Sequence, residues 1–270
     1  MNILGNPDWF TKCKHIFVFC NYFNKKHDVM NQLSDEIREK LKNISTATIA
    51  TYLFKKGLRN QFIQNVYPLS HLKENMVGEA FTLRYIPARE DLNPITIFKD
   101  PKHPQRVAIE TCPKGAVLVI DSRKNARAAS AGSILITRLM KRGAAGIVTD
   151  GGLRDSEEIA NLNFHSYHQK PTAPTNLTLH QALDINVPIG CGDVAVFPGD
   201  IVVGDRDGVI IIPLNIVNEV ATEGETMTLF EAFVIEQVNK DRSILGLYPP
   251  TDKQTLIDFE AWKNLKPRQN

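Results

Sequence analysis

The sequence predicts an α/β protein whose central sheet combines parallel and antiparallel strands. A strand, a helix and a second strand follow one another between Gly115 and Asp150 over ~35 residues, the pattern of a βαβ unit with a right-handed crossover. Residues 187–213 contain short apolar runs broken by glycine, proline and aspartate, which is typical of closely spaced antiparallel strands. A composition of 43% hydrophobic and 23% charged residues excludes a disordered, collagen-like or coiled-coil chain of this length, 270 residues.

Two helices and a strand are expected before this unit. Ser34 can cap a helix because apolar residues recur after it at helical spacing. Ser45 opens a second helix that runs through Lys56, where Gly57 is a suitable C-terminal cap. Residues 78–86 alternate apolar and polar side chains, which predicts a strand.

The βαβ unit and its flanks follow in order. Residues 104–112 predict a weak helix with Pro104 at its first position. The continuous apolar runs 115–120 and 145–150 predict buried strands on either side of a helix over 132–142. After the antiparallel segment, residues 214–240 predict a long amphipathic helix.

The chain is expected to hold one α/β domain over residues 30–250, because no linker divides it. Residues 1–29 differ in character and are interpreted as an accessory N-terminal arm or a mis-assigned start. Residues 251–270 are interpreted as a polar C-terminal tail that packs loosely.

Charge and cysteine usage exclude several classes of protein. A net charge of +2 gives no electrostatic case for binding nucleic acid or a membrane surface. No stretch approaches the ~20 apolar residues of a membrane helix. The four cysteines form no CxxC pair and are expected to be free thiols, so we expect a cytoplasmic protein.

A first candidate site follows the second buried strand, in residues 150–155. Ligands collect at the carboxyl ends of strands in open α/β sheets, and two glycines here permit close backbone approach. Arg154 can form a forked contact with a carboxylate, and Asp155 can hold a hard divalent cation. The alternative is an ion-paired loop.

A second candidate site is the small-residue segment 129–134, which leads directly into a helix. The exposed N–H groups of a helix start can bind an anion. The βαβ unit places this helix start and the Arg154–Asp155 loop at the same end of the sheet. The alternative is a simple Ser-capped helix.

The spacing of these two segments resembles a known family. In the class II pyruvate aldolases that cleave 4-hydroxy-4-methyl-2-oxoglutarate, a glycine and an acid open a helix, and Arg-Asp begins twenty-one positions after that acid. The family also includes oxaloacetate decarboxylases and the regulator of ribonuclease activity A. Here Gly132 and Ser133 open the helix, Arg154 stands at the same offset, and Glu158 supplies a further acid. Residues 147–151 and 204–209 also resemble the family.

The resemblance implies a fold and a set of roles. The fold would be a layered α/β sandwich of the phosphohistidine swivelling-domain type with a mixed central sheet, assembled as homotrimers or homohexamers. Arg154 would bind the substrate carboxylate, and Asp155 would be the direct protein ligand of Mg²⁺ or Mn²⁺. Sites in the family lie between subunits, so Glu225 of a neighbouring subunit is a further candidate. Backbone N–H groups would hold the 2-oxo acid at Gly132, Ser133, Ile134 and Leu135.

Ser133 departs from the family pattern, in which an acid orders a water used in proton transfer. A serine hydroxyl is a poor base near neutral pH. Retro-aldol cleavage must deprotonate a hydroxyl, whereas decarboxylation needs only polarisation of the ketone. Ser133 therefore weakens the aldolase interpretation more than the decarboxylase one, unless a substitute base exists at Asp121, Asp150 or Glu158.

Two functions from different classes follow. The main hypothesis is a divalent-metal-dependent lyase that cleaves a carbon–carbon bond of a 2-oxo acid to give pyruvate, by oxaloacetate-type decarboxylation or retro-aldol cleavage. Arg154, Asp155 and Ser133 would be its catalytic residues. The alternative is a non-catalytic protein that binds and regulates a ribonuclease. In either case no nucleic acid or membrane is expected as a partner.

Other polar residues have either a functional or an ordinary structural interpretation. Arg123 or Arg127 could bind a second substrate carboxylate, or could lie in an exposed loop. The spacing of His165, His168 and His180 favours surface or hydrogen-bonding histidines over metal ligands. Cys191 is expected to be a buried thiol.

Overall fold

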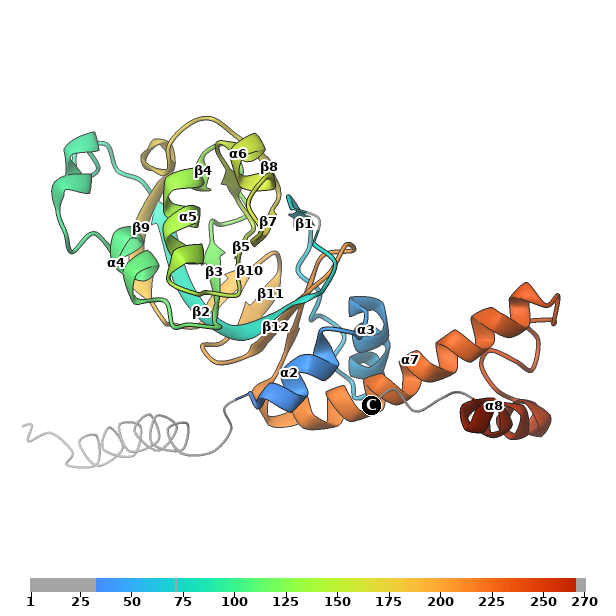
Figure 1. Cartoon of the computed structure of the whole chain (residues 1–270). Coiled ribbons are helices and arrows are strands. Elements are labelled where there is room, and N and C mark those ends of the chain that lie inside the picture. The colour runs from blue at the N-terminus through green and yellow to red at the C-terminus, as the bar shows by residue number, and fades with distance from the viewer. Residues whose placement is uncertain (1–32, 71, 266–270) are drawn as a thin grey trace, which may run out of the picture.

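A mixed eight-stranded sheet forms the centre of the computed structural model, which describes residues 33–70 and 72–265 (Figure 1). The order along the sheet is β1-β7-β5-β3-β2-β12-β13, and β9 also pairs with β2. The α/β class and the mixed sheet are as predicted. The proposed arm over residues 1–29 lies outside the described residues.

The parallel part of the sheet contains the predicted βαβ unit. Strand β2 (Met76–Pro87) runs parallel to β3 (Val117–Asp121), and β3 runs parallel to β5 (Gly146–Thr149). Helix α5 (Ser133–Lys141) connects β3 to β5. Strand β7 (His165–His168) continues the parallel order beyond β5.

The antiparallel part lies on the other side of β2. Strand β12 (Ile201–Gly204) pairs antiparallel with both β2 and β13 (Val209–Ile212), which confirms the prediction for this segment. A separate hairpin forms from β10 (Ile189–Cys191) and β11 (Val194–Val196). The sheet is completed by β1 (Tyr67–Pro68) and β9 (His180–Ile185).

A small three-stranded sheet at the carboxyl ends of β3 and β5 was not predicted. It consists of β4 (Ala129–Ala131), β6 (Gly152–Leu153) and β8 (Lys170–Pro171), with parallel pairing. The two segments expected to converge on a site therefore run side by side, because β4 precedes α5 and β6 precedes Arg154.

Helices cover the sheet in separate groups, as Figure 1 shows. Helices α4 (Pro104–Thr111), α5 and α6 (Ser156–Ala160) pack on the parallel strands through one apolar cluster. A second cluster joins α2 (Asp35–Leu41), α3 (Thr46–Lys55) and α7 (Val217–Asn239) to the antiparallel strands. The β10–β11 hairpin packs on the sheet through a third cluster.

The predicted caps of the first two helices are confirmed. The Ser34 hydroxyl accepts the N–H of Ile37 at 3.3 Å, and the Ser45 hydroxyl accepts the N–H of Thr48 at 3.0 Å. Each bond satisfies an N–H group that the helix itself leaves without a partner.

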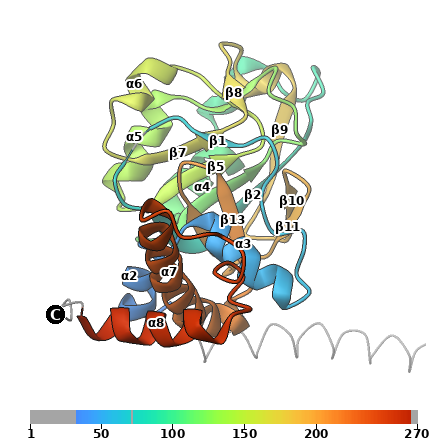
Figure 2. The same cartoon turned by 90° about the vertical axis from the view of Figure 1, so that its right-hand side faces the viewer.

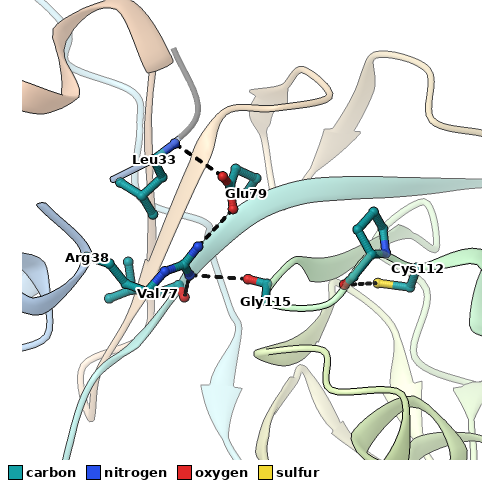
Figure 3. A network of polar contacts seen from close by, with 7 residues as sticks. Leu33, Arg38, Val77, Glu79, Cys112 and Gly115 are labelled. Carbon is teal, nitrogen blue, oxygen red and sulfur yellow. Dashed lines mark hydrogen bonds and ion pairs between the residues drawn. The ribbon is translucent and has the colours of Figure 1, made fainter. Parts of the chain in front are cut away.

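Arg38 connects α2 to the central strand β2 by hydrogen bonds and an ion pair (Figure 3). Its guanidinium donates to the carbonyl oxygens of Val77 at 2.7 Å and Gly115 at 3.2 Å. It also forms an ion pair with Glu79, whose carboxylate accepts the N–H of Leu33. One side chain therefore connects α2, β2 and the turn that leads into β3.

The C-terminal segment differs from its prediction. Helix α7 (Val217–Asn239) extends away from the sheet, and α8 (Lys253–Leu265) lies against its far half (Figures 1 and 2). Residues 251–265 are thus not a loosely packed tail, since Phe259 and Trp262 are buried against Phe233. The segment was predicted to be a tail because most of its residues are polar. Its three buried residues, Thr255, Phe259 and Trp262, nevertheless recur at helical spacing.

Three short 3-10 helices complete the described elements: Ile95–Lys99, Asn176–Thr178 and Leu214–Ile216. Within residues 33–70 and 72–265, no helix has the length and apolar character to span a bilayer.

Candidate active site

Arg154 and Asp155 lie between β6 and α6, at the carboxyl end of the parallel strands. Asp155 is the residue before the first turn of α6 and has a left-handed backbone conformation, with φ of 60°. Aspartate is one of the few residue types that adopt this conformation readily. The turn directs the Asp155 side chain toward the start of α5 rather than onto its own helix, to which it makes no capping bond.

The start of α5 binds the Asp155 carboxylate directly. The N–H of Ser133 donates to Asp155 Oδ2 at 3.1 Å, and the Ser133 hydroxyl donates to the same oxygen at 3.4 Å. Arg154 Nε lies 3.4 Å from Asp155 Oδ1. The structure therefore brings together the three residues that the sequence singled out for catalysis. The simple Ser-capped helix is wrong, because Gly132 is the capping residue and Ser133 contacts Asp155.

Gly132 is required by this close approach. A Cβ added there would lie 2.7 Å from Asp155 Oδ2 and 2.8 Å from Arg154 Cγ, which is closer than real Cβ atoms come to their neighbours. The backbone at Gly132 is extended and would accept any residue. The reason for glycine is thus the space taken by the two charged side chains.

Cavities open on both sides of the Arg154–Asp155 pair. One, of about 500 Å³, is bounded by α6 and includes Glu158. The other, of about 400 Å³, is bounded by α4 and the start of α5, and includes Gly132, Ile134 and Leu135. The side chain of Arg154 is 46% exposed and that of Asp155 is 32% exposed, so both can reach a ligand.

The donor set fits a hydrated magnesium ion rather than a closed metal cage. Among the described residues, no group of three or more His, Cys, Asp and Glu side chains is arranged to hold a metal. Mg²⁺ commonly binds through one or two carboxylates and keeps several waters. Asp155 is such a carboxylate, since it is partly exposed and faces open space on two sides.

The three proposed substitute bases lie in different surroundings. Asp150 is buried and accepts the N–H groups of Ser122, Lys124 and Gly192, and burial raises its pKa to about 6. It supports the loop after β3 and lines neither cavity. Asp121 accepts the N–H of Arg123 and also lies outside both cavities. Glu158 alone of the three lines a cavity beside Asp155.

The other polar candidates have structural contacts. Arg123 donates to the carbonyl of Leu179 at 2.7 Å, and exposed Arg127 contacts Asn125, so neither lines the cavities. His180 is fully buried and its Nε2 bonds the carbonyl of Asn125 at 3.0 Å.

His168 is also buried, and His165 is half-buried and lines a third cavity together with Tyr167 and Asp205. The expectation of a hydrogen-bonding histidine is confirmed for His180, and a surface position is wrong for His168. Cys191 is a buried free thiol, as predicted, and burial raises its pKa well above its usual value. Glu225 forms an ion pair with Lys40 at 3.4 Å on the α2–α7 side of its own chain, and its role at a neighbouring subunit stays a prediction.

Sequence reasoning missed two residues of the cavity beside α4. Arg106 projects from α4 and Asn176 from the 3-10 helix that follows residue 175. They lie far from the Arg154 loop in sequence, and neither stands in a recognisable motif. Only the packing of α4 against α5 brings Arg106 to the site.

The fold and this site define a family. Residues 31–211 match the RraA-like family, described as Aldolase/RraA, and the chain belongs to it. The resemblance drawn from the sequence is therefore confirmed.

Individual relatives agree with this assignment. The chain is 39% identical over 99 residues to a provisionally named 4-hydroxy-4-methyl-2-oxoglutarate aldolase of Halalkalibacterium halodurans, over 37% of this chain and 47% of the relative. It is 25% identical over 207 residues to Protein DlpA of Legionella pneumophila, over 77% of this chain and 32% of that protein. The chain thus spans about half or less of these two curated relatives.

Solved structures share the fold. RraAS2 of Streptomyces coelicolor, described as an unusual member of the RNase ES inhibitor RraA protein family, aligns with a TM-score of 0.66 at 25% identity. The alignment covers 76% of this chain and 98% of that one. A protein of Pseudomonas syringae pv. tomato aligns with a TM-score of 0.69 at 19% identity, over 81% of this chain and all of the other.

Proposed function

We propose that this protein is a divalent-metal-dependent lyase that cleaves a carbon–carbon bond of a 2-oxo acid and releases pyruvate. The observation that carries the proposal is the convergence of Ser133, Arg154 and Asp155 at the start of α5, between two cavities. The relatives named for aldolase activity support the same class of reaction.

Each residue would have a separate task. Arg154 would bind the substrate carboxylate through its guanidinium, and N–H groups at the start of α5 would orient the 2-oxo acid. Asp155, held by Ser133, would bind Mg²⁺ or Mn²⁺, which when bound would polarise the 2-oxo group and stabilise developing negative charge. Cleavage leaves the electron pair of the broken bond on C3 of the pyruvyl unit, and a proton then adds to that carbon.

Decarboxylation is the favoured form of this reaction. Loss of CO₂ requires no deprotonation of a hydroxyl, so the absence of an acid at position 133 does not obstruct it. Retro-aldol cleavage would require a base, and Glu158 is the carboxylate in position to serve. Oxaloacetate is therefore the first substrate to test.

The test is pyruvate release from oxaloacetate with Mg²⁺, corrected for the rate with Mg²⁺ alone, and repeated with EDTA. We expect turnover that EDTA abolishes and that Asp155→Ala lowers by at least about 100-fold, since that variant loses the metal ligand. The proposal would be contradicted if neither oxaloacetate nor 4-hydroxy-4-methyl-2-oxoglutarate gave pyruvate above the background rate.

The alternative proposal is a regulator that binds a ribonuclease without catalysis. It is favoured by the likeness to RraAS2, which covers nearly all of that chain. The regulator proposal is tested by a pull-down with a purified endoribonuclease of the RNase E type, together with an RNA-cleavage assay. Binding that survives Asp155→Ala, together with no 2-oxo acid turnover, would favour the regulator.

Assembly and location form part of the same proposal. We take the chain to act in the cytoplasm as a homotrimer or homohexamer with a site shared between subunits. Light scattering after size-exclusion chromatography tests the assembly, and a monomer at micromolar concentration with full activity would contradict it. Cell fractionation tests the location.

A further inference from the structure

Helix α7 has one apolar face, which is covered at its start and exposed at its end. In the first turns, the buried residues of this face recur three or four positions apart and pack against α2, α3 and the loop between them: Val217, Val220, Ala221 and Gly224. The same spacing places Glu231, Ile235 and Val238 on this face. Thr48, in the first turn of α3, donates to Glu231 at 2.8 Å, and beyond this contact Ile235 is 62% and Val238 is 44% exposed. The end of α7 therefore projects past α2 and α3 with its apolar face open to solvent (Figure 1).

Exposed apolar side chains are concentrated at this end of the molecule. Of the sixteen large hydrophobic side chains that are exposed among the described residues, nine lie in residues 229–265. Single exposed apolar side chains are ordinary on a protein surface, whereas a concentration of them on one projecting unit is typical of a contact surface. We therefore expect the open end of the α7 face to have a further partner.

The charge of α7 indicates the chemistry of that partner. The helix has five glutamates and no basic residue over its 23 positions. Glu219, Glu225 and Glu236 each pair with a lysine. Within the described part of the chain, Glu223 and Glu231 form no ion pair. A segment that covers the open end should therefore be both apolar and basic.

Residues 1–32, which precede the described part of the chain, contain a stretch of this composition. The largely apolar run over residues 16–23 includes three phenylalanines and a tyrosine. Four lysines flank the run: Lys12, Lys14, Lys25 and Lys26. Residues 1–32 include only two acidic residues, so their net positive charge is complementary to that of α7.

The point where this segment joins the body puts the run within reach of the open face. Leu33 belongs to the same apolar cluster as Val217, the first residue of α7. Ile235 lies ~27 Å further along the helix at a rise of ~1.5 Å per residue. Residues 24–32 separate the run from Leu33, and an extended stretch of that length spans up to ~30 Å. The run can therefore lie against the end of α7 of its own chain.

We propose that residues 16–26 bind to the docking face of α7 in the same chain, which is formed by Glu231, Ile235 and Val238. The apolar run would cover the two aliphatic side chains, and a lysine that follows the run would pair with the glutamate. Both partners lie outside the family match, which covers residues 31–211. The contact therefore concerns parts of the chain beyond the matched domain, and it does not depend on the proposed function.

Carbodiimide cross-linking of the full-length protein tests the contact, because the reagent joins lysines to carboxylates that touch. Chains of monomer mass are separated from dimers on a denaturing gel, and the linked peptides are identified by mass spectrometry. We expect a link from Lys25 or Lys26 to Glu231 in the monomer band. Its yield should fall at least about tenfold in Ile235→Ser/Val238→Ser, since full burial of one branched apolar side chain is worth about tenfold or more in an equilibrium constant.

Leu256→Ser/Ile257→Ser is the matched control, because it replaces two similarly exposed apolar side chains on α8, outside the docking face. This control should give the wild-type yield. The rate of alkylation of Cys20 under reducing conditions is a second measurement, since this thiol lies within the run. Alkylation should be at least about tenfold slower in wild type and in the control than in Ile235→Ser/Val238→Ser.

Three results would overturn the proposal. A link found only in the dimer band would mean that a second copy supplies the segment. Absence of the link from both bands would mean that the lysines do not meet Glu231. A link yield and a Cys20 alkylation rate that stay at wild-type values in Ile235→Ser/Val238→Ser would mean that the docking face does not hold the run.

Discussion

At the scale of single residues, the site depends on the conformation of Asp155. Its left-handed backbone directs the carboxylate across to α5, where the N–H and hydroxyl of Ser133 hold it. Two hydrogen bonds to one oxygen limit the rotation of the carboxylate. The same carboxylate therefore serves as a tether between two loops and as the candidate metal ligand.

Asp155→Asn separates these two roles. Asparagine tolerates the left-handed conformation and its amide oxygen can still accept from Ser133, so the free energy of unfolding should change by less than about 1 kcal/mol. The loss of charge should lower Mg²⁺-dependent pyruvate release by at least about 100-fold. Urea unfolding and the pyruvate assay measure the two effects.

Asp193→Asn is the control, because Asp193 is also left-handed and partly exposed but pairs with Lys124 instead. It should leave both measurements near wild type. Full activity of the Asp155→Asn variant would contradict the assignment of Asp155 as the metal ligand.

Gly132→Ala tests the space between the helix start and the two charged side chains. The added methyl group would displace Asp155 and Arg154, and we expect oxalate affinity to fall by about tenfold or more. The extended backbone at this position adds no strain of its own. Gly190→Ala is the control, since a Cβ there meets no atom within 4 Å. Equal oxalate affinity in the two variants would show that the close approach has no functional consequence.

At the scale of elements, the ends of three strands are joined beneath the site by hydroxyl groups. The Ser130 hydroxyl lies 2.6 Å from that of Thr149 and 2.7 Å from that of Ser122. The N–H of Gly151 also donates to the Thr149 hydroxyl. This buried network links β3, β4 and β5 and fixes the segments that lead to Gly132 and Arg154.

The sequence predicted the helices and strands whose formation depends mainly on residues close together in the chain. Ser34 and Ser45 caps, the apolar run of β3 and the short strands around β12 depend on neighbours in the chain, so the patterns were sufficient. The small sheet of β4, β6 and β8 was missed because strands of two or three residues carry no periodicity. The βαβ unit predicted that the start of α5 and the Arg154–Asp155 loop would lie at the same end of the sheet. The position of Arg106 was not predicted, because it depends on how α4 packs.

The hydrogen bonds that His180 forms with neighbouring segments make the free energy of unfolding depend on pH. Arg123 donates toward Nδ1, and Nε2 donates to the carbonyl of Asn125, which defines a neutral ring. Burial lowers the pKa of His180 to about 4. The unfolded chain takes up a proton near pH 6.5 and the folded chain does not, so the free energy of unfolding falls as the pH drops from 6.5 to 4.

His180→Gln should reduce this dependence, by up to about 3 kcal/mol at pH 4, because glutamine stays neutral in both states. Urea unfolding at pH 7, 6, 5 and 4 measures the slope. His165 and His168 also have a pKa lowered to about 4 by burial, so part of the slope should remain. An identical slope in wild type and variant would mean that His180 is protonated equally in both states.

At the scale of the whole molecule, α8 and the far half of α7 form a unit distinct from the α/β body. Their shared cluster contains Phe233, Phe259 and Trp262, which contact one another and belong to none of the three clusters around the sheet. The family match ends at residue 211, before α7 begins. The first turns of α7, in contrast, pack on α2 and the antiparallel strands through Val217 and Val220.

Phe259→Ala should therefore release α8 without unfolding the body. Large-to-small changes at buried aromatic positions cost ~3–5 kcal/mol, which is enough to undock one short helix that has a single small core. Hydrogen exchange followed by mass spectrometry should show faster exchange over residues 253–265 and unchanged protection in β2, β3 and β5. Leu256→Ala, at an exposed position of the same helix, should leave exchange as in wild type. Faster exchange throughout the sheet in Phe259→Ala would instead place α8 in the same cooperative unit as the site, because cooperative units lose protection together.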